Sequence, residues 1–161
     1  MLIGVLSDTH DRVPLIAKAL DLFTERRVEV VVHAGDLCSP FAAKALKAVE
    51  DRCPLHVIFG NNEGEMAGLT AVLPQLQRGP LRLEFGGRRI LVHHFEKWCE
   101  PEDVSWAEVV ITGHTHEVVN ETRDGRLFLN PGECCGWVNG RCTVAILDTT
   151  EPKAEIAELK P

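Results

Sequence analysis

The sequence predicts an α/β fold that begins with a parallel sheet. Three apolar stretches rich in β-branched residues alternate with two amphipathic helical segments between residues 2 and 59. The order strand, helix, strand, helix, strand is typical of parallel strands joined by right-handed crossovers. A polar segment follows each of these strands, at the edge where open α/β sheets bind their ligands. We therefore expect the functional residues at the carboxyl ends of the strands.

The first five elements follow from their apolar spacing and from signals at their ends. Leu2–Leu6 is an apolar run and predicts a buried strand. Pro14 suits the first turn of a helix that continues to about Phe23. The next three elements are expected as a strand over Val28–His33, a helix over Pro40–Val49 and a strand over Leu55–Phe59.

The second half of the chain is richer in strands. Gly86-Gly87 separates two β-rich runs, 81–85 and 88–93, which is typical of a hairpin. Pro101 argues against one continuous helix between residues 95 and 106. Further strands are expected over residues 109–111, 118–119, 127–129, 142–147 and 154–159.

Composition narrows the class of protein. The chain has 161 residues, is 45% hydrophobic and carries a formal net charge of -7. This length favours a single domain over residues 1–161 with a full hydrophobic core. The acidic balance argues against an extended nucleic-acid-binding surface. No apolar run approaches the length of a membrane span, so we expect no membrane partner.

The cysteines and the N-terminus indicate a reducing compartment. The six cysteines form no C-x-x-C motif, and no charged segment precedes the first apolar run as in a signal peptide. We therefore expect a cytoplasmic protein with reduced thiols. The adjacent Cys134 and Cys135 are expected to be buried as small apolar residues rather than redox-active.

Five polar clusters each follow a short apolar strand. Their side chains are carboxylates, imidazoles and a carboxamide, a donor set that suits Mn, Fe, Co, Ni or Zn better than a soft metal. The clusters are Asp8-x-His10, Gly35-Asp36, Gly60-Asn61-x-Glu63, His93 and Gly113-His114-x-His116.

Each cluster also has a purely structural interpretation when it is taken alone. Asp36 could cap the helix that follows it, and Gly60-Asn61 could form a turn. His33 and His56 lie inside apolar strands, so we expect them to be core or edge histidines and not ligands. If no metal were bound, a separate structural explanation would be needed at each of the five strand ends. A single metal site explains all five clusters together and is therefore favoured.

The ordered set D-x-H, G-D, G-N-x-E, H and G-H-x-H resembles the calcineurin-like metallophosphoesterase superfamily. The segments Ser7-Asp8-Thr9-His10-Asp11 and Asn130-Pro131-Gly132-Glu133-Cys134-Cys135-Gly136 resemble its small single-domain prokaryotic phosphodiesterases. The resemblance runs from Met1 to about Asp148. It implies a two-sheet β-sandwich flanked by helices, in four layers α-β-β-α, and a dinuclear metal centre.

The resemblance also implies how the ligands divide between two divalent metal ions. The expected ions are manganese first, with nickel, iron, cobalt or zinc as alternatives. By position, one ion would be held by Asp8, His10 and His116, the other by Asn61, His93 and His114, with Asp36 bridging the two.

The chain departs from this branch around its fourth motif and beside its third. Glycine usually follows the ligand histidine, but here His94 follows His93, and we choose His93 because it directly ends its strand. Many relatives carry a catalytic histidine where this chain has Asn62. His94 is therefore our candidate proton donor, beside Asp36 and Asn61 as the other catalytic residues.

The implied function is a metal-dependent phosphodiesterase that hydrolyses small phosphodiesters with a metal-bridging hydroxide. The expected binding partner is the small phosphodiester substrate. Association with further copies of the chain in a homo-oligomer is left open. A catalytically silent scaffold of the same fold is one alternative, although every ligand position holds a metal-binding residue type. A phosphomonoesterase or a nuclease is another, although a nuclease would need a surface for a polymer.

Overall fold

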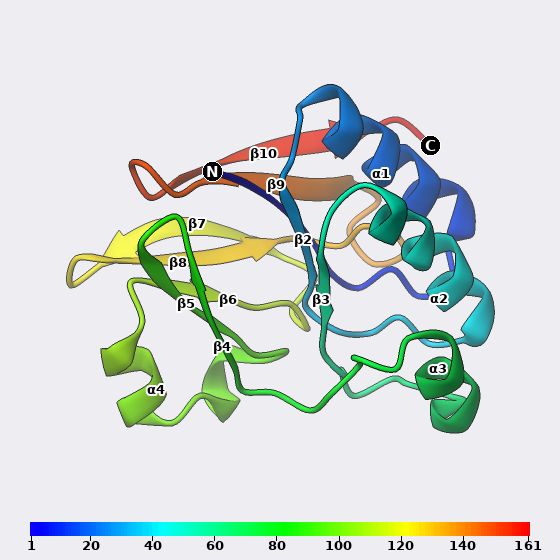
Figure 1. The fold of residues 1–161 in the computed structure, drawn as a ribbon, viewed down its shortest axis with the longest axis horizontal. Coiled ribbons are helices and arrows are strands. Elements are labelled where there is room, and N and C mark those ends of the chain that lie inside the picture. The colour runs from blue at the N-terminus through cyan, green and yellow to red at the C-terminus, as the bar shows by residue number, and fades with distance from the viewer.

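The first sheet is built around the N-terminal strand. The computed structural model describes residues 1–161, and its strands form two five-stranded sheets (Figure 1). β1 (Leu2–Leu6) lies at the centre of the first sheet, in the order β10-β9-β1-β2-β3. The neighbours β2 (Val30–His33) and β3 (Leu55–Val57) run parallel to β1, and β9 (Cys142–Asp148) and β10 (Lys153–Leu159) complete the sheet in antiparallel pairing.

The second sheet has the order β4-β5-β6-β8-β7. β4 (Leu81–Phe85) and β5 (Arg88–Val92) form the expected hairpin. The central strands β5, β6 (Val109–Ile111) and β8 (Arg126–Pro131) are parallel, and β7 (Val118–Arg123) closes the edge in antiparallel pairing with β8.

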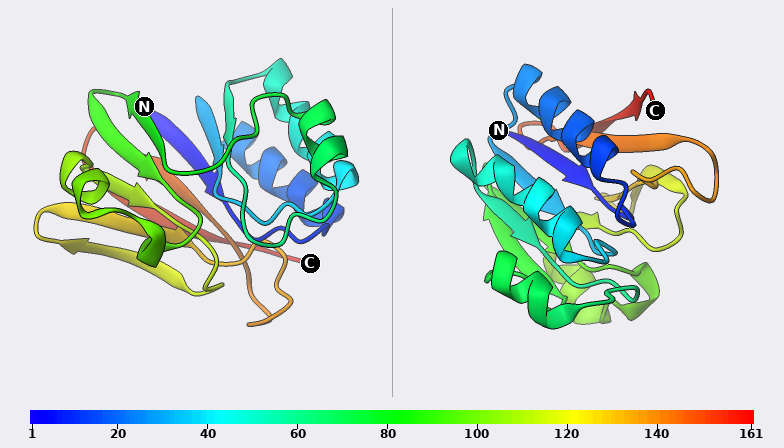
Figure 2. Two further views of the ribbon diagram at one scale, coloured as in Figure 1. Left: turned by 90° about the horizontal axis from the view of Figure 1, so that it is seen from below. Right: turned by 90° about the vertical axis from the view of Figure 1, so that its right-hand side faces the viewer.

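Helices cover the outer face of each sheet, so the molecule has four layers (Figure 2). Three helices lie on the first sheet: α1 (Val13–Glu25), α2 (Pro40–Lys47) and α3 (Met66–Val72). Ile3 and Val5 point into the core between the sheets, whereas Leu6 packs with the helices, as the alternation of a strand requires. The expected four-layer sandwich is confirmed.

The segment from residue 95 to residue 106 contains two short helices. A 3-10 turn spans Glu96–Trp98, and α4 (Pro101–Trp106) covers the outer face of the second sheet. Pro101 begins α4 because the first helical position needs no amide hydrogen. A further 3-10 turn, Ala48–Asp51, extends α2.

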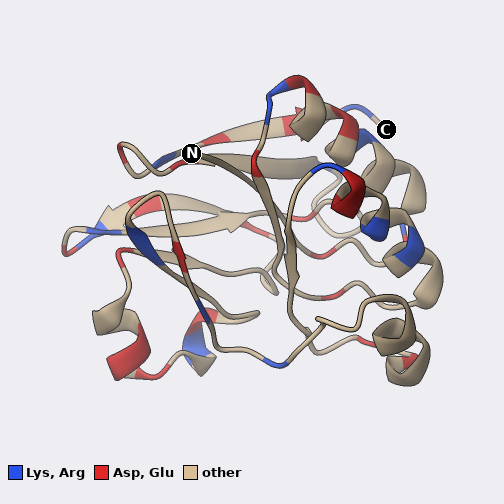
Figure 3. Ribbon diagram, in the orientation of Figure 1, with Lys and Arg blue, Asp and Glu red and all other residues tan.

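Charged residues of both signs are interspersed over the fold (Figure 3). No helix of the chain is long and apolar enough to cross a membrane. All six cysteines are free, and Cys134 and Cys135 are fully buried, as expected from the sequence.

Candidate metal centre

Strand register brings the five polar clusters to one end of the sandwich. Leu6 of β1 lies beside His33 of β2, which lies beside Val57 of β3, so the loops that follow leave the sheet together. In the second sheet Val92 pairs with Ile111, which aligns the ends of β5 and β6 in the same way. The loops after β1, β2, β3, β5 and β6 carry all the expected ligands.

Close approach between these loops requires glycine at two positions. A side chain at Gly35, whose φ is 103°, would meet the ring of His94, and one at Gly60 would meet the carboxylate of Asp36. Several site residues have left-handed backbone as well, a costly conformation that clusters at functional sites. These residues are Asp8, His10, Asp36, His114 and His116.

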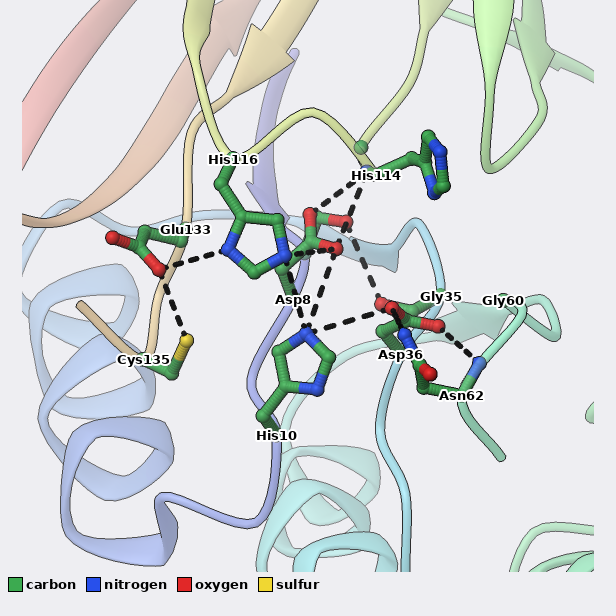
Figure 4. A network of polar contacts seen from close by, with 12 residues as sticks. Asp8, His10, Gly35, Asp36, Gly60, Asn62, His114, His116, Glu133 and Cys135 are labelled. Carbon is green, nitrogen blue, oxygen red and sulfur yellow. Dashed lines mark hydrogen bonds and ion pairs between the residues drawn. The ribbon is translucent and has the colours of Figure 1, made fainter. Parts of the chain in front are cut away.

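Four side chains form a first group of donors (Figure 4). One ligand atom from each of Asp8, His10, Asp36 and His116 lies within 4.8 Å of the others. His10 Nε2 lies 3.5 Å from Asp36 Oδ2 and 3.3 Å from His116 Nε2. The side chains of Asp8 and Asp36 are buried, with 0% and 1% exposed. This group brings together the residues that the sequence assigned to one ion and to the bridge.

A second group of donors meets at Asn61. Its Oδ1 lies 2.9 Å from His94 Nε2 and 2.6 Å from His114 Nδ1. Asp36 Oδ1 lies 3.5 Å from the same nitrogen of His94. Asp36 therefore directs Oδ2 to the first group and Oδ1 to the second.

The structure does not bring His93 into either group. The ring of His93 lies against Gly79 and the indole of Trp98, with 5.9 Å between the two ring centroids. Its Nδ1 is buried without a hydrogen-bond partner. His94, and not the expected His93, is therefore the histidine that the structure places beside Asn61 and Asp36.

The hydrogen bonds of two histidines test whether the site suits a cation. His116 Nδ1 lies 2.8 Å from the carboxylate of Glu133, which can only accept, so Nδ1 carries the proton. In the neutral ring the lone pair of Nε2 then faces Asp8 Oδ1 at 3.6 Å. His94 behaves alike, because its Nδ1 lies 2.8 Å from the carbonyl oxygen of Ala34. Acceptor atoms thus converge in both groups, and a cation between them would satisfy them.

Comparison with known proteins shows the family of the chain. A family model for the calcineurin-like phosphoesterase superfamily domain matches residues 1–152. The chain belongs to this superfamily. A phosphodiesterase of Methanocaldococcus jannaschii is 38% identical over 157 residues, which cover 92% of this chain and 93% of that protein.

Solved structures show the same relationship. The structure of an archaeal phosphodiesterase superposes with a TM-score of 0.83 at 33% identity, covering 99% of this chain and 100% of the other. A phosphoesterase from E. coli, with a TM-score of 0.72 at 20% identity over 92% of this chain and 89% of its own, shows the same fold. This chain is therefore an enzyme of the metallophosphoesterase class, with a cluster of residues suited to a metal.

Burial and contacts set the charge states in this phosphoesterase site. Burial raises the pKa of Asp8 above its ordinary value. Burial acts on Asp36 in the same sense, but contacts with His94 and Asn62 outweigh it and hold the pKa of Asp36 well below its usual range. Although burial favours neutral His94, the same carboxylate raises the pKa of that ring. A bound metal would compete with this proton for Nε2.

Three polar residues beside the site received no role from the sequence. Glu63 accepts hydrogen bonds from the amides of Gly60, Asp36, Leu37 and Cys38, and so joins the loops after β2 and β3. Asn62 donates to both oxygens of Asp36, each at 2.8 Å. Glu133 is buried against His116. The motifs N-x-E and N-P-G-E contained the two glutamates, but a motif alone does not show which amides a carboxylate accepts from.

Proposed function

We propose that this metallophosphoesterase hydrolyses small phosphodiesters at a dinuclear metal centre. The observation that carries the proposal is the position of Asp36, whose two oxygens face different donor groups. In this proposal Asp8, His10 and His116 hold one ion, and Asn61, His94 and His114 hold the other. The likeness to a phosphodiesterase supports a diester substrate.

In this proposal, bound metal ions would take the place of a protein base. Bound divalent ions would supply Lewis-acid chemistry at the phosphate and would lower the pKa of water, so that no strong protein base would be needed. Among the proposed ligands only Asp8 and Asp36 are carboxylates, and together they would neutralise half the charge of two divalent ions. The site therefore attracts an anionic phosphate within an acidic protein.

The leaving oxygen receives no dedicated acid from the residues around the site. Asn62 occupies the position where many relatives have a histidine, and its amide is engaged with Asp36. His94 holds its Nδ1 proton against Ala34 and directs Nε2 to the metal-binding group, so it is not placed to donate a proton. We therefore replace the expected role of His94 as proton donor by a role as ligand. Diesters with good leaving groups depend least on an acid.

Two finer assignments complete the proposal. Manganese is the ion that we propose first, because the site mixes carboxylate and amide oxygens with imidazole nitrogens; nickel, iron, cobalt and zinc accept the same donors. The six free cysteines support action in the reducing cytoplasm.

Hydrolysis of bis(p-nitrophenyl) phosphate tests the function. Metal-depleted protein should be inactive and should recover on addition of Mn²⁺, Ni²⁺, Fe²⁺, Co²⁺ or Zn²⁺. Asp36→Asn should lose more than about tenfold in kcat/KM, equivalent to at least about 1.4 kcal/mol, because it weakens both groups. The matched control is Asp21→Asn, an exposed aspartate on α1. Absence of hydrolysis with every metal would contradict the proposed activity.

Elemental analysis tests the dinuclear centre separately. The reconstituted protein should contain about two ions per chain, and Asp36→Asn should contain fewer. A content that never exceeds one ion per chain would contradict two metal sites while leaving a mononuclear phosphodiesterase.

A further inference from the structure

A hollow opens directly beside the second donor group. It has a volume of about 340 Å³ and is lined by Phe59, Gly60, Asn61, Glu63, Met66, Arg78 and Trp98. Asn61 belongs to both features, because its Oδ1 contacts His94 and His114. A substituent on a phosphate held at the second group therefore has this hollow within reach.

Trp98 forms an aromatic wall between the hollow and the donor group. Its ring centroid lies 5.8 Å from that of His114 and 6.1 Å from that of His94. Phe95 packs almost perpendicular to it, with 5.6 Å between centroids and 84° between planes, and so fixes the indole. Trp98 is nevertheless 46% exposed. A fixed and half-exposed indole is a suitable surface for stacking a planar ring.

Two further lining residues matter for binding: Met66 offers an apolar surface, and Arg78 offers a guanidinium group without an ion-pair partner. Met66, at the start of α3, is 42% exposed and offers an apolar surface to the hollow. Arg78 is exposed and has no carboxylate partner, whereas Arg82, Arg88 and Arg123 all form ion pairs. Glu63 is already occupied by the amides of Asp36, Leu37, Cys38 and Gly60, so it does not compete for Arg78.

We propose that this hollow is a specificity subsite for the nucleobase of a nucleoside phosphodiester. The base would stack on Trp98, contact Met66 with its edge, and accept hydrogen bonds from the guanidinium of Arg78. A plain alkyl group offers neither a π-face nor acceptor atoms, so it gains little from the same residues. This inference rests on the proposed phosphodiesterase activity and specifies its substrate class.

Two diesters with the same leaving group test the subsite. The p-nitrophenyl ester of thymidine 5′-monophosphate carries a nucleobase, whereas methyl p-nitrophenyl phosphate does not, and both release p-nitrophenolate. The wild-type, metal-loaded enzyme should favour the thymidine ester by about tenfold or more in kcat/KM. Trp98→Ala and Arg78→Ala should each reduce this ratio by about fivefold or more, mainly through the KM of the thymidine ester. Trp98→Phe should keep most of the ratio, because it keeps an aromatic face.

Control variants and a binding measurement make the test specific. Trp106→Ala, at a tryptophan of α4 on the outer face of the second sheet, and Arg89→Ala should leave the ratio unchanged. Calorimetric titration of thymidine 5′-monophosphate into metal-loaded protein should show binding that weakens in Trp98→Ala. Hydrolysis of both esters without preference, or a preference that survives Trp98→Ala and Arg78→Ala, would overturn the subsite and leave the proposed function intact. Failure to hydrolyse either ester would instead contradict the phosphodiesterase itself.

Discussion

Glu133 fixes the orientation of His116 from behind the site. Its Oε2 accepts a hydrogen bond from His116 Nδ1 at 2.8 Å, and this contact leaves Nε2 of the ring directed at Asp8 and His10 (Figure 4). The amides of Val138 and Asn139 also donate to Glu133. Despite its burial, these contacts lower the pKa of Glu133 to about 2, so the carboxylate is charged at neutral pH. Carboxylates in this position make a histidine a stronger metal ligand.

Glu133→Gln should therefore weaken metal binding without removing a ligand. We expect the affinity of the first ion to fall by about 10-fold to 100-fold, because the amide supplies no charge behind His116. Competition with a fluorescent chelator measures this affinity. Glu117→Gln, an exposed neighbour of His116, is the matched control. Equal affinities in Glu133→Gln and wild type would show that the contact does not tune the site.

The two adjacent histidines after β5 should differ sharply in metal content. His94→Ala should lose about one ion per chain, because His94 Nε2 faces Asn61 and Asp36. His93→Ala should retain both ions, since its ring lies against Gly79 and Trp98. Elemental analysis of the two variants, prepared alike, decides between them. Loss of an ion from His93→Ala alone would restore the assignment made from sequence.

Strand alternation explains why the structure places His94 and not His93 beside Asn61 and Asp36. Ile90 and Val92 face the core between the sheets, whereas Leu91 faces α4. Continued past the strand end, this alternation directs His94 toward the first sheet and His93 away from it. The signal was therefore present, but it could be used only once the inner face of β5 was known. Proximity to the strand end alone favoured His93.

Most of the fold and of the donor set could be predicted because they depend on local pattern. The βαβαβ unit, the hairpin at Gly86-Gly87 and the polar clusters at strand ends all appear where their residues predict them. The contacts of Glu63, Asn62 and Glu133 could not be predicted, since they join loops that are distant in the sequence. Pro101 was informative for a local reason: it separates the 3-10 turn Glu96–Trp98 from α4, and it suits the first turn of that helix.

His33 should make the metal-free protein less stable in acid. It is fully buried, with Gly35 N–H donating to Nδ1 and Nε2 lying 3.0 Å from Thr9 Oγ1, and burial lowers its pKa to about 3. As pH falls, His33 therefore becomes protonated near pH 6.5 in the unfolded chain, but only near pH 3 in the folded protein. The contribution of neutral His33 to the free energy of unfolding is complete above pH 6.5. It is lost as pH falls toward 3, with a slope of up to about 1.4 kcal/mol per pH unit.

Denaturant unfolding in the presence of a chelator measures this dependence. His33→Gln removes the titrating group while keeping a donor toward Thr9, so its unfolding free energy should vary less between pH 6.5 and pH 4.5. His56→Gln, at a half-buried histidine of β3, should change the slope less. Identical slopes in wild type and His33→Gln would show that His33 does not titrate on unfolding.

The reaction should depend steeply on the leaving group, because Asn62 acts on Asp36 and not on the substrate. Asn62 donates to both oxygens of Asp36 and has no proton to transfer at neutral pH. In a series of aryl methyl phosphodiesters, kcat/KM should therefore fall strongly as the pKa of the phenol rises.

Asn62→Ala should lower kcat/KM by a similar factor for every member of the series, because it removes one hydrogen bond from a carboxylate that acts on all the substrates alike. The slope against phenol pKa should stay the same. A steeper slope in Asn62→Ala would mean that Asn62 assists departure of the leaving group, and a shallow slope in the wild type would mean that another residue serves as the acid.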